Sequence, residues 1–174
     1  LAFGIALLGC SKTTTERLQL PPLEVVPEVD LERYLGTWYE IASYPMFFQP
    51  GCTATTADYS LREDGLIKVI NSCRKGSLDG KLKQAKGRAK VVDTETNAKL
   101  KVWFFWPFKG NYWIIDLSPD YQWAVVGEPS RKYLWILSRT PTMDGAVYQG
   151  ILERLPQKGY DPAKLRKTAQ VASE

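Results

Sequence analysis

The chain has 174 residues, a formal net charge of +4, 44% hydrophobic residues and 24% charged residues, as expected for one globular domain with an ordinary core. Its Lys and Arg residues are dispersed and accompany no nucleic-acid motif, which argues against a nucleic-acid-binding protein. The sequence contains no His, which excludes His-based catalytic triads and the usual His-ligated zinc sites, and we expect no metal or other cofactor.

The chain begins with an apolar run, residues 1–9, that is too short to span a bilayer. The last part of this run and the residue after it, Leu7-Leu8-Gly9-Cys10, resemble the cleavage box of bacterial lipoproteins. The resemblance implies that residues 1–9 are part of a signal peptide and that Cys10 becomes a lipidated N-terminus. Because no Asp follows Cys10, it also implies an outer-membrane anchor, with the protein facing the periplasm. The alternative is a plain secretory signal with an incidental Cys.

Residues 10–29 are predicted to form the lipidated Cys and a flexible tether, because they are polar, contain Pro21, Pro22 and Pro27, and show no sustained periodicity. Fully extended, the tether would reach roughly 60 Å at about 3.3 Å per residue. We therefore expect the folded domain to span residues 30–174.

The domain is predicted to be all-β. Asp30 is suited to cap a one-turn helix over 31–35, which Gly36 ends. Short aromatic and β-branched runs, separated by turns such as Glu63-Asp64-Gly65, then predict eight strands over 37–44, 53–61, 66–72, 84–91, 98–105, 112–117, 123–127 and 133–138. With no helix between them, these strands favour an antiparallel up-and-down barrel or a sandwich. A helical pattern over 142–155 predicts one amphipathic helix packed on the outside.

Three motifs now become informative because of their order and spacing: Gly36-x-Trp38, the stretch that starts Asn111-Tyr112-Trp113-Ile114, and Leu137-Ser138-Arg139. They resemble the three signatures of the lipocalin family, and the chain from about 30 to 170 resembles its bacterial lipoprotein branch, close to apolipoprotein D. The second motif departs from the family, since Leu117-Ser118 stands where a Thr-Asp pair is usual. The resemblance implies an eight-stranded calyx, open at one end, that binds a small hydrophobic molecule.

Strand alternation sorts the side chains of this barrel into inner and outer sets. Trp38 and Arg139 are expected to point inward and to stack, which would seal the barrel floor; the alternative is that Arg139 is a solvated strand-end charge. In the strand over 84–91, small residues alternate with Lys and Arg, and small inner residues leave volume for a cavity. The predicted ligand-lining residues are Ala42, Tyr44, Ala57, Tyr59, Val69, Asn71, Gly87, Ala89, Val102, Phe104, Tyr112, Ile114, Val126 and Trp135.

Two further features are the remaining cysteines and two apolar segments that are expected near the open end. Cys52 and Cys73 flank the predicted hairpin at 63–65, and a secreted location permits a disulfide between them, which we favour over two free thiols. Two apolar segments, 45–50 and 102–108, would form a lid, a membrane-touching rim or a dimer interface, or pack as ordinary loops.

The sequence therefore favours a membrane-anchored protein, not an enzyme, that stores or transports fatty acids or lysophospholipids in the bacterial cell envelope. One alternative is an enzyme built on the same calyx, with a Cys thiol or the inward Glu40 as its catalytic group. Another is an envelope interaction protein with a filled barrel. The sequence leaves a homodimer open.

Overall fold

The structure is a computed structural model that describes residues 20–105 and 108–171. Its elements are α1 (Leu31–Tyr34), β1 (Gly36–Ser43), β2 (Cys52–Leu61), β3 (Ile67–Lys75), β4 (Leu82–Val91), β5 (Lys99–Phe105), β6 (Phe108–Leu117), β7 (Trp123–Gly127), β8 (Leu134–Ser138), α2 (Gly145–Arg154), the short 3-10 helices η1 (Pro156–Lys158) and η2 (Pro162–Lys164), and β9 (Arg166–Lys167). None of the helices among these described residues is both long and apolar enough to cross a membrane.

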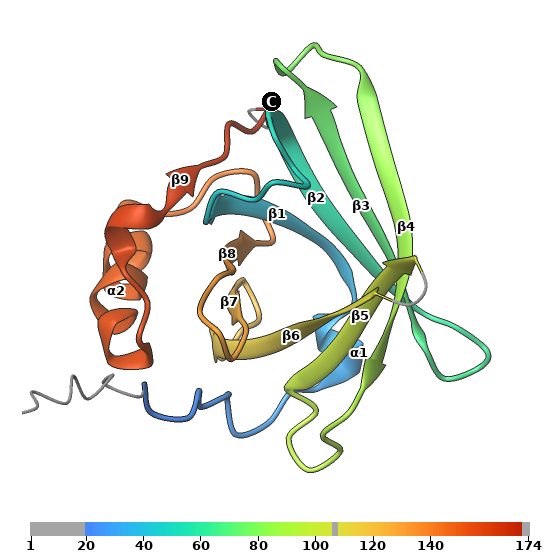
Figure 1. Cartoon of the computed structure of the whole chain (residues 1–174), viewed down its shortest axis with the longest axis vertical. Helices are drawn as coiled ribbons and strands as arrows, with labels where there is room; N and C mark the ends of the chain where they lie inside the picture. The colour runs from blue at the N-terminus through green and yellow to red at the C-terminus, as the bar shows by residue number, and fades with distance from the viewer. Residues whose placement is uncertain (1–19, 106–107, 172–174) are drawn as a thin grey trace, which may run out of the picture.

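The eight long strands form one closed antiparallel barrel, which is seen end-on in Figure 1. Each strand pairs with the next in the chain, β8 pairs with β1, and β1 pairs with β2 through Gly36–Tyr39 and Thr56–Tyr59, which closes the ring. The predicted barrel is therefore confirmed, and the sandwich is wrong. The sequence did not predict β9, a two-residue strand that adds to β1.

The two ends of the barrel differ. Asp30 caps α1 by accepting from Arg33 N, and α1 lies directly before β1, at what we call the closed end. Because all neighbouring strands are antiparallel, the connections over 62–66, 92–98 and 118–122 lie at this end as well. The connections over 44–51, 76–81 and 128–133 lie at the opposite, open end. Cys52 and Cys73 form a disulfide at the open end, with Cα atoms 5.5 Å apart, as predicted.

Helix α2 packs on the outer wall, as predicted, and begins three residues later than expected. Asp144 is its N-cap, because its carboxylate accepts from the backbone N–H groups of Ala146 (2.9 Å) and Val147 (3.1 Å). The buried side chains of Ile151 and Leu155 pack in an outer cluster with residues from the barrel wall. The wall residues of this outer cluster are Ala42, Tyr44, Ile115, Val125, Leu134 and Ile136.

The described part of the predicted tether, residues 20–29, is packed against the barrel. Leu23 and Val29 are buried, and the backbone N–H groups of Val26 and Val29 donate to Ile114 O (3.0 Å) and Thr96 O (2.8 Å). Residues 20–29 are thus not a free tether, and the division of the chain at residue 30 stays a prediction. Residues 1–19, including Cys10, lie outside the described residues, so the signal peptide and the lipidation site stay predictions.

Two of the predicted ligand-lining residues, Ala42 and Tyr44, face outward, and their predicted inward orientation is wrong. The pairing of β1 with β8 shifts register between Glu40 and Ala42, so the alternation that starts at Trp38 is reversed beyond the bulge. Tyr44 instead ties the C-terminal segment to β1. Its hydroxyl donates to Asp161 O (2.8 Å) and accepts from Asp161 N (2.7 Å).

Candidate ligand-binding site

The interior of the barrel holds one continuous apolar cluster, separate from the outer cluster beneath α2. Nine predicted ligand-lining residues belong to this inner cluster: Ala57, Tyr59, Val69, Ala89, Val102, Tyr112, Ile114, Val126 and Trp135. Asn71 and Gly87 pair directly with Ala57 and Val69, so they face inward too. Phe104 lies against Gly87, since a Cβ built on that glycine would meet Phe104 Cδ1 at 2.6 Å. These positions place the residues inside the barrel, and their contact with a ligand stays a prediction.

Trp38 and Arg139 form the barrel floor. The Arg139 guanidinium lies over the indole of Trp38, 3.8 Å from the ring centroid. It also donates to three backbone carbonyl oxygens, those of Arg33 (2.6 Å), Thr37 (3.0 Å) and Tyr121 (3.3 Å). Arg139 thus joins α1, β1 and the 118–122 connection, and the alternative of a solvated strand-end charge is wrong.

Replacing Arg139 with alanine is expected to lower the free energy of unfolding by about 2–4 kcal/mol, because the change removes a cation–π contact and leaves carbonyl groups without a donor. The matched control is Arg154→Ala. Arg154 also lies over a tryptophan, Trp123, at 5.4 Å, but on the outer surface with an exposed ion pair to Asp116, so we expect a loss below about 1 kcal/mol. Urea unfolding of both variants measures the difference, and equal losses would contradict the floor role.

The inner side chains are packed at the closed end and reached by solvent at the open end. Trp38, Ala98 and Ala124 are fully buried. Val102 and Asn71 keep partial exposure, and Phe104 is 37% exposed. Because these side chains point inward, solvent enters the upper part of the barrel.

Three tyrosine hydroxyls meet inside the barrel, from α1, β2 and β6. Tyr59 donates to Tyr112 at 3.0 Å, and Tyr112 and Tyr34 share a second hydrogen bond at 2.8 Å. Three hydroxyls carry three protons, and two of these are used in the two bonds, so one proton has no acceptor within the trio. One O–H group of the trio is therefore not used within it. The sequence analysis did not predict Tyr34 as an interior residue because it considered strand residues only. The position of Tyr34, four residues before the inward-pointing Trp38, could have indicated it.

Burial keeps these hydroxyls protonated. It raises the pKa of Tyr59 to about 12 and the pKa values of Tyr34 and Tyr112 well above their ordinary value near 10. In the unfolded chain the same tyrosines ionise near pH 10. The trio's contribution to stability is therefore complete below pH 10 and falls as the pH rises above 10; the part that comes from Tyr59 is lost between about pH 10 and pH 12.

We accordingly expect the free energy of unfolding to fall above pH 10, with Tyr59 alone contributing roughly 2–3 kcal/mol of this loss by pH 12, at about 1.4 kcal/mol per pKa unit. In Tyr59→Phe the decline should be shallower, because one of the shifted groups is gone. Urea unfolding between pH 8 and pH 11.5 gives both slopes, and identical slopes would refute the assignment.

Asn71 provides a hydrogen-bond acceptor in the interior of the barrel. Its Oδ1 atom is buried, and among the described residues no hydrogen-bond donor reaches it. A buried acceptor without a donor destabilises the protein by about 1–3 kcal/mol. The interior therefore holds one unused acceptor, Asn71 Oδ1, in addition to the tyrosine O–H that is not used within the trio.

A row of aromatic rings leads from the interior to the open end. The ring centroids are separated by 6.0 Å between Trp135 and Tyr133, 5.7 Å between Tyr133 and Phe48, and 5.3 Å between Phe48 and Phe47. Trp135 belongs to the inner cluster, whereas Phe47 is 84% exposed and Phe48 is 56% exposed. The row is a continuous series of aromatic contacts from the inner cluster to the open end.

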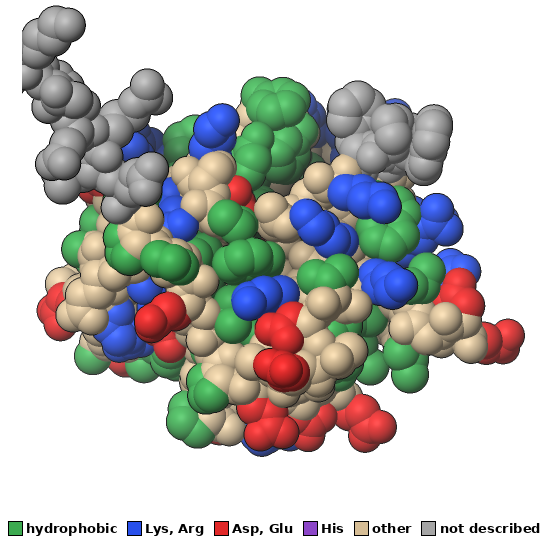
Figure 2. Space-filling model, turned by 60° about the horizontal axis from the view of Figure 1, so that its bottom comes forward, with side chains coloured by type: hydrophobic (Ala, Val, Ile, Leu, Met, Phe, Trp, Pro, Cys, Tyr) green, Lys and Arg blue, Asp and Glu red, His purple; other side chains and the backbone are tan. Residues whose placement is uncertain are grey.

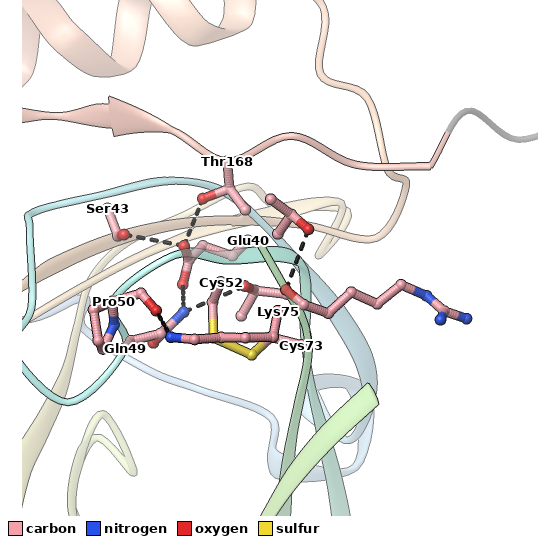
Figure 3. Close-up of a disulfide and its surroundings, with 11 residues drawn as sticks. Glu40, Ser43, Gln49, Pro50, Cys52, Cys73, Lys75 and Thr168 are labelled. Atoms are coloured by element: carbon pink, nitrogen blue, oxygen red, sulfur yellow. Dashed lines mark hydrogen bonds between the residues drawn. A yellow bond between two sulfur atoms is a disulfide. The ribbon is translucent and has the colours of Figure 1, made fainter. Parts of the chain in front are cut away.

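The two groups considered for catalysis are both engaged in structure, as Figure 3 shows. Cys52 and Cys73 are joined, so neither provides a thiol. The buried Glu40 carboxylate accepts hydrogen bonds from Ser43 Oγ (3.0 Å), Gln49 Nε2 (3.1 Å) and Thr168 Oγ1 (2.5 Å). Glu40 thus fastens the C-terminal segment to β1 and the 44–51 connection.

Comparison with known proteins agrees with the barrel fold described above. The profile of the lipocalin-like domain family matches residues 29–170. Temperature-induced lipocalin-1 of Arabidopsis thaliana is 44% identical over 157 residues, which cover 85% of this chain and 83% of that protein. The outer membrane lipoprotein Blc of Escherichia coli (strain K12) is 43% identical over 158 residues, which cover 91% and 86%. Among solved structures, insecticyanin from the tobacco hornworm Manduca sexta has a TM-score of 0.68 at 21% identity, covering 87% of this chain and 86% of that chain, and shows the same fold.

Proposed function

This chain belongs to the lipocalin family, and from that membership we propose that it binds one fatty acid or lysophospholipid in the upper part of its barrel. The observation that carries the proposal is the solvent-reached, apolar interior above a sealed floor. An acyl chain transferred into such an interior gains about 25 cal/mol for each Å² of apolar surface removed from water. Binding of this kind needs no catalytic group.

The polar groups of the interior support an amphiphile over a plain hydrocarbon. Asn71 Oδ1 suits a hydroxyl or a protonated carboxyl group. A fatty acid carries both an acceptor and a donor when protonated, and the glycerol hydroxyl of a lysophospholipid does the same.

The proposal includes a membrane anchor at Cys10. The cleavage-box pattern at residues 7–10 supports it, as does the 43% identity to a protein named an outer membrane lipoprotein. We propose that the acylated chain is held on the outer membrane, facing the periplasm, where it stores or transports lipids of the cell envelope.

Native mass spectrometry tests the binding function directly. The chain over 11–174 keeps every described residue, including the packed segment 20–29, and lacks the lipidation site. A fatty acid or lysophospholipid that copurifies at about one molecule per chain, identified after organic extraction, is the expected result. A bare mass that does not shift when either lipid is added would favour the filled barrel instead.

A further inference from the structure

The open end carries an exposed apolar rim, which we define as Phe47 and Phe48. These two side chains are 84% and 56% exposed, although the pair is in contact edge to face. The rim belongs to the 44–51 connection, and the disulfide at Cys52 holds the strand that follows. It is therefore an exposed apolar projection next to a cross-linked strand.

Beside the rim lies a surface groove of about 630 Å³, which we call the basic groove. Its walls include four cationic side chains and one carboxylate: Arg131, Lys132, Lys164, Arg166 and Asp161. Within residues 20–105 and 108–171, none of the four cations is within ion-pair distance of a carboxylate. Arg131 and Arg166 donate to backbone carbonyl oxygens. Their positive charge, with that of Lys132 and Lys164, is thus not neutralised by an ion pair within the described residues.

The closed end has the opposite character. Its connections carry five carboxylates, of which Asp64 and Asp93 form ion pairs with Arg62 and Lys99; the five are Glu63, Asp64, Asp93, Glu95 and Asp120. Figure 2 shows the contrast across one face, with Asp and Glu gathered along the lower edge and with hydrophobic, Lys and Arg side chains along the upper edge. Such a charge distribution would turn the open end toward an anionic surface and the closed end away from it.

The N-terminal segment enters the domain at the same end. Arg131 Nη2 donates to Pro21 O at 2.6 Å, and Leu20 lines the basic groove. Ten residue steps separate Cys10 from Leu20 and span roughly 33–36 Å at most, at about 3.3–3.6 Å per residue. An acylated Cys10, which belongs to the proposed function, would therefore attach the chain to the membrane from the side of the open end.

We propose that the open end docks on the surface of an anionic phospholipid bilayer. The rim enters the headgroup layer, while the cations of the basic groove lie against lipid phosphates. The mouth of the barrel then faces the bilayer, so a lipid passes between the two along the aromatic row without crossing bulk water.

The test measures vesicle binding by the chain over 11–174, so that neither an acyl group nor residues 1–9 contribute. Vesicles of phosphatidylethanolamine with phosphatidylglycerol are compared with vesicles of phosphatidylcholine alone, in sedimentation assays at low and high salt. Binding is expected on the anionic vesicles, weakened at least about tenfold by 0.5 M salt, where the Debye length falls below about 5 Å. Equal binding to both vesicle types would overturn the proposal.

Two pairs of variants locate the surface. Phe47→Ser/Phe48→Ser should weaken binding to anionic vesicles by about tenfold or more. Its control, Leu61→Ser, removes a side chain that is 64% exposed at the closed end and should leave binding unchanged. Lys132→Glu/Lys164→Glu should weaken binding similarly, whereas Lys68→Glu, an exposed position on β3, should not. Circular dichroism establishes that each variant is folded.

Equal effects of the test and control variants would overturn the proposal. So would sedimentation of the free chain as a dimer that Phe47→Ser/Phe48→Ser dissociates, because a second copy would then cover the rim. The vesicle assay uses no added ligand. A negative result in the vesicle assay is therefore distinct from a failure of ligand binding, which native mass spectrometry tests separately.

Discussion

Replacing Ala57 with tryptophan is expected to weaken the binding of a fatty acid or lysophospholipid by about 50-fold. Ala57 faces inward from β2, opposite Asn71, and is only partly buried. An indole at this position would occupy space that we assign to the acyl chain. If it displaces about three CH₂ groups, at about 0.8 kcal/mol each, the affinity falls by nearly two orders of magnitude.

The matched control is Ser60→Trp, which adds the same side chain to the same strand. Ser60 is exposed and lies on the opposite face of β2 from Ala57. Isothermal titration calorimetry should show unchanged affinity for this variant and a large loss for Ala57→Trp. Because overpacking destabilises proteins by about 1–3 kcal/mol, the thermal melt of Ala57→Trp has to show a folded protein at the titration temperature.

Unchanged affinity in a folded Ala57→Trp variant would place the ligand outside the barrel. The basic groove would then be the next site to consider, because it is lined by four cations and is open to solvent. Loss of affinity in both variants would point to a general effect of the added tryptophan. The pair of variants therefore separates the interior from the surface.

Strand alternation predicted most of the interior, because a barrel wall buries one face of each strand. The strand β4 shows why: Gly87 and Ala89 face in, while Lys86, Arg88 and Lys90 face out. The charged residues would be strongly destabilising inside, so only one orientation of this strand is stable. The same reasoning placed the inner residues of β2, β3, β6, β7 and β8 correctly.

Alternation failed where the register changes, at the bulge after Glu40. The bulge inserts one residue that no sequence pattern indicates, so each residue of β1 after the bulge points to the opposite side of the barrel wall from the one predicted. Only Glu40 could have indicated the bulge. An inward carboxylate needs partners, and its partners, Gln49 and Thr168, come from segments that alternation does not place. The resulting error affects both Ala42 and Tyr44.

The positions of segments that are held by a few separate contacts could not be predicted either. Residues 20–29 lie on the barrel through isolated hydrogen bonds, such as that from Val26 N to Ile114 O, and through a few buried side chains. Neither a strand nor a helix pattern describes such a segment. The strand β9 is only two residues long, and its position depends on Tyr44 and Glu40, so no local pattern distinguishes it.

Replacing Cys10 with alanine is expected to move the protein from the membrane fraction to the soluble fraction almost completely. One myristoyl chain alone gives a membrane association constant of about 10⁴ M⁻¹, and stable anchoring needs a second chain or a basic patch. A lipidated Cys10 would provide the chains, and the substitution would remove all of them. Fractionation of cells that produce each form, followed by quantitative immunoblotting, measures the change.

The double variant Cys52→Ala/Cys73→Ala is the control, because it removes both other cysteines and should leave the protein on the membrane. Docking through the open end predicts a further detail for Cys10→Ala. The small fraction that remains on membranes should be released by 0.5 M salt, since it is held by the basic groove and the rim alone. A Cys10→Ala protein that resists the salt wash would contradict the lipid anchor, because apolar insertion elsewhere in the chain would then be holding it.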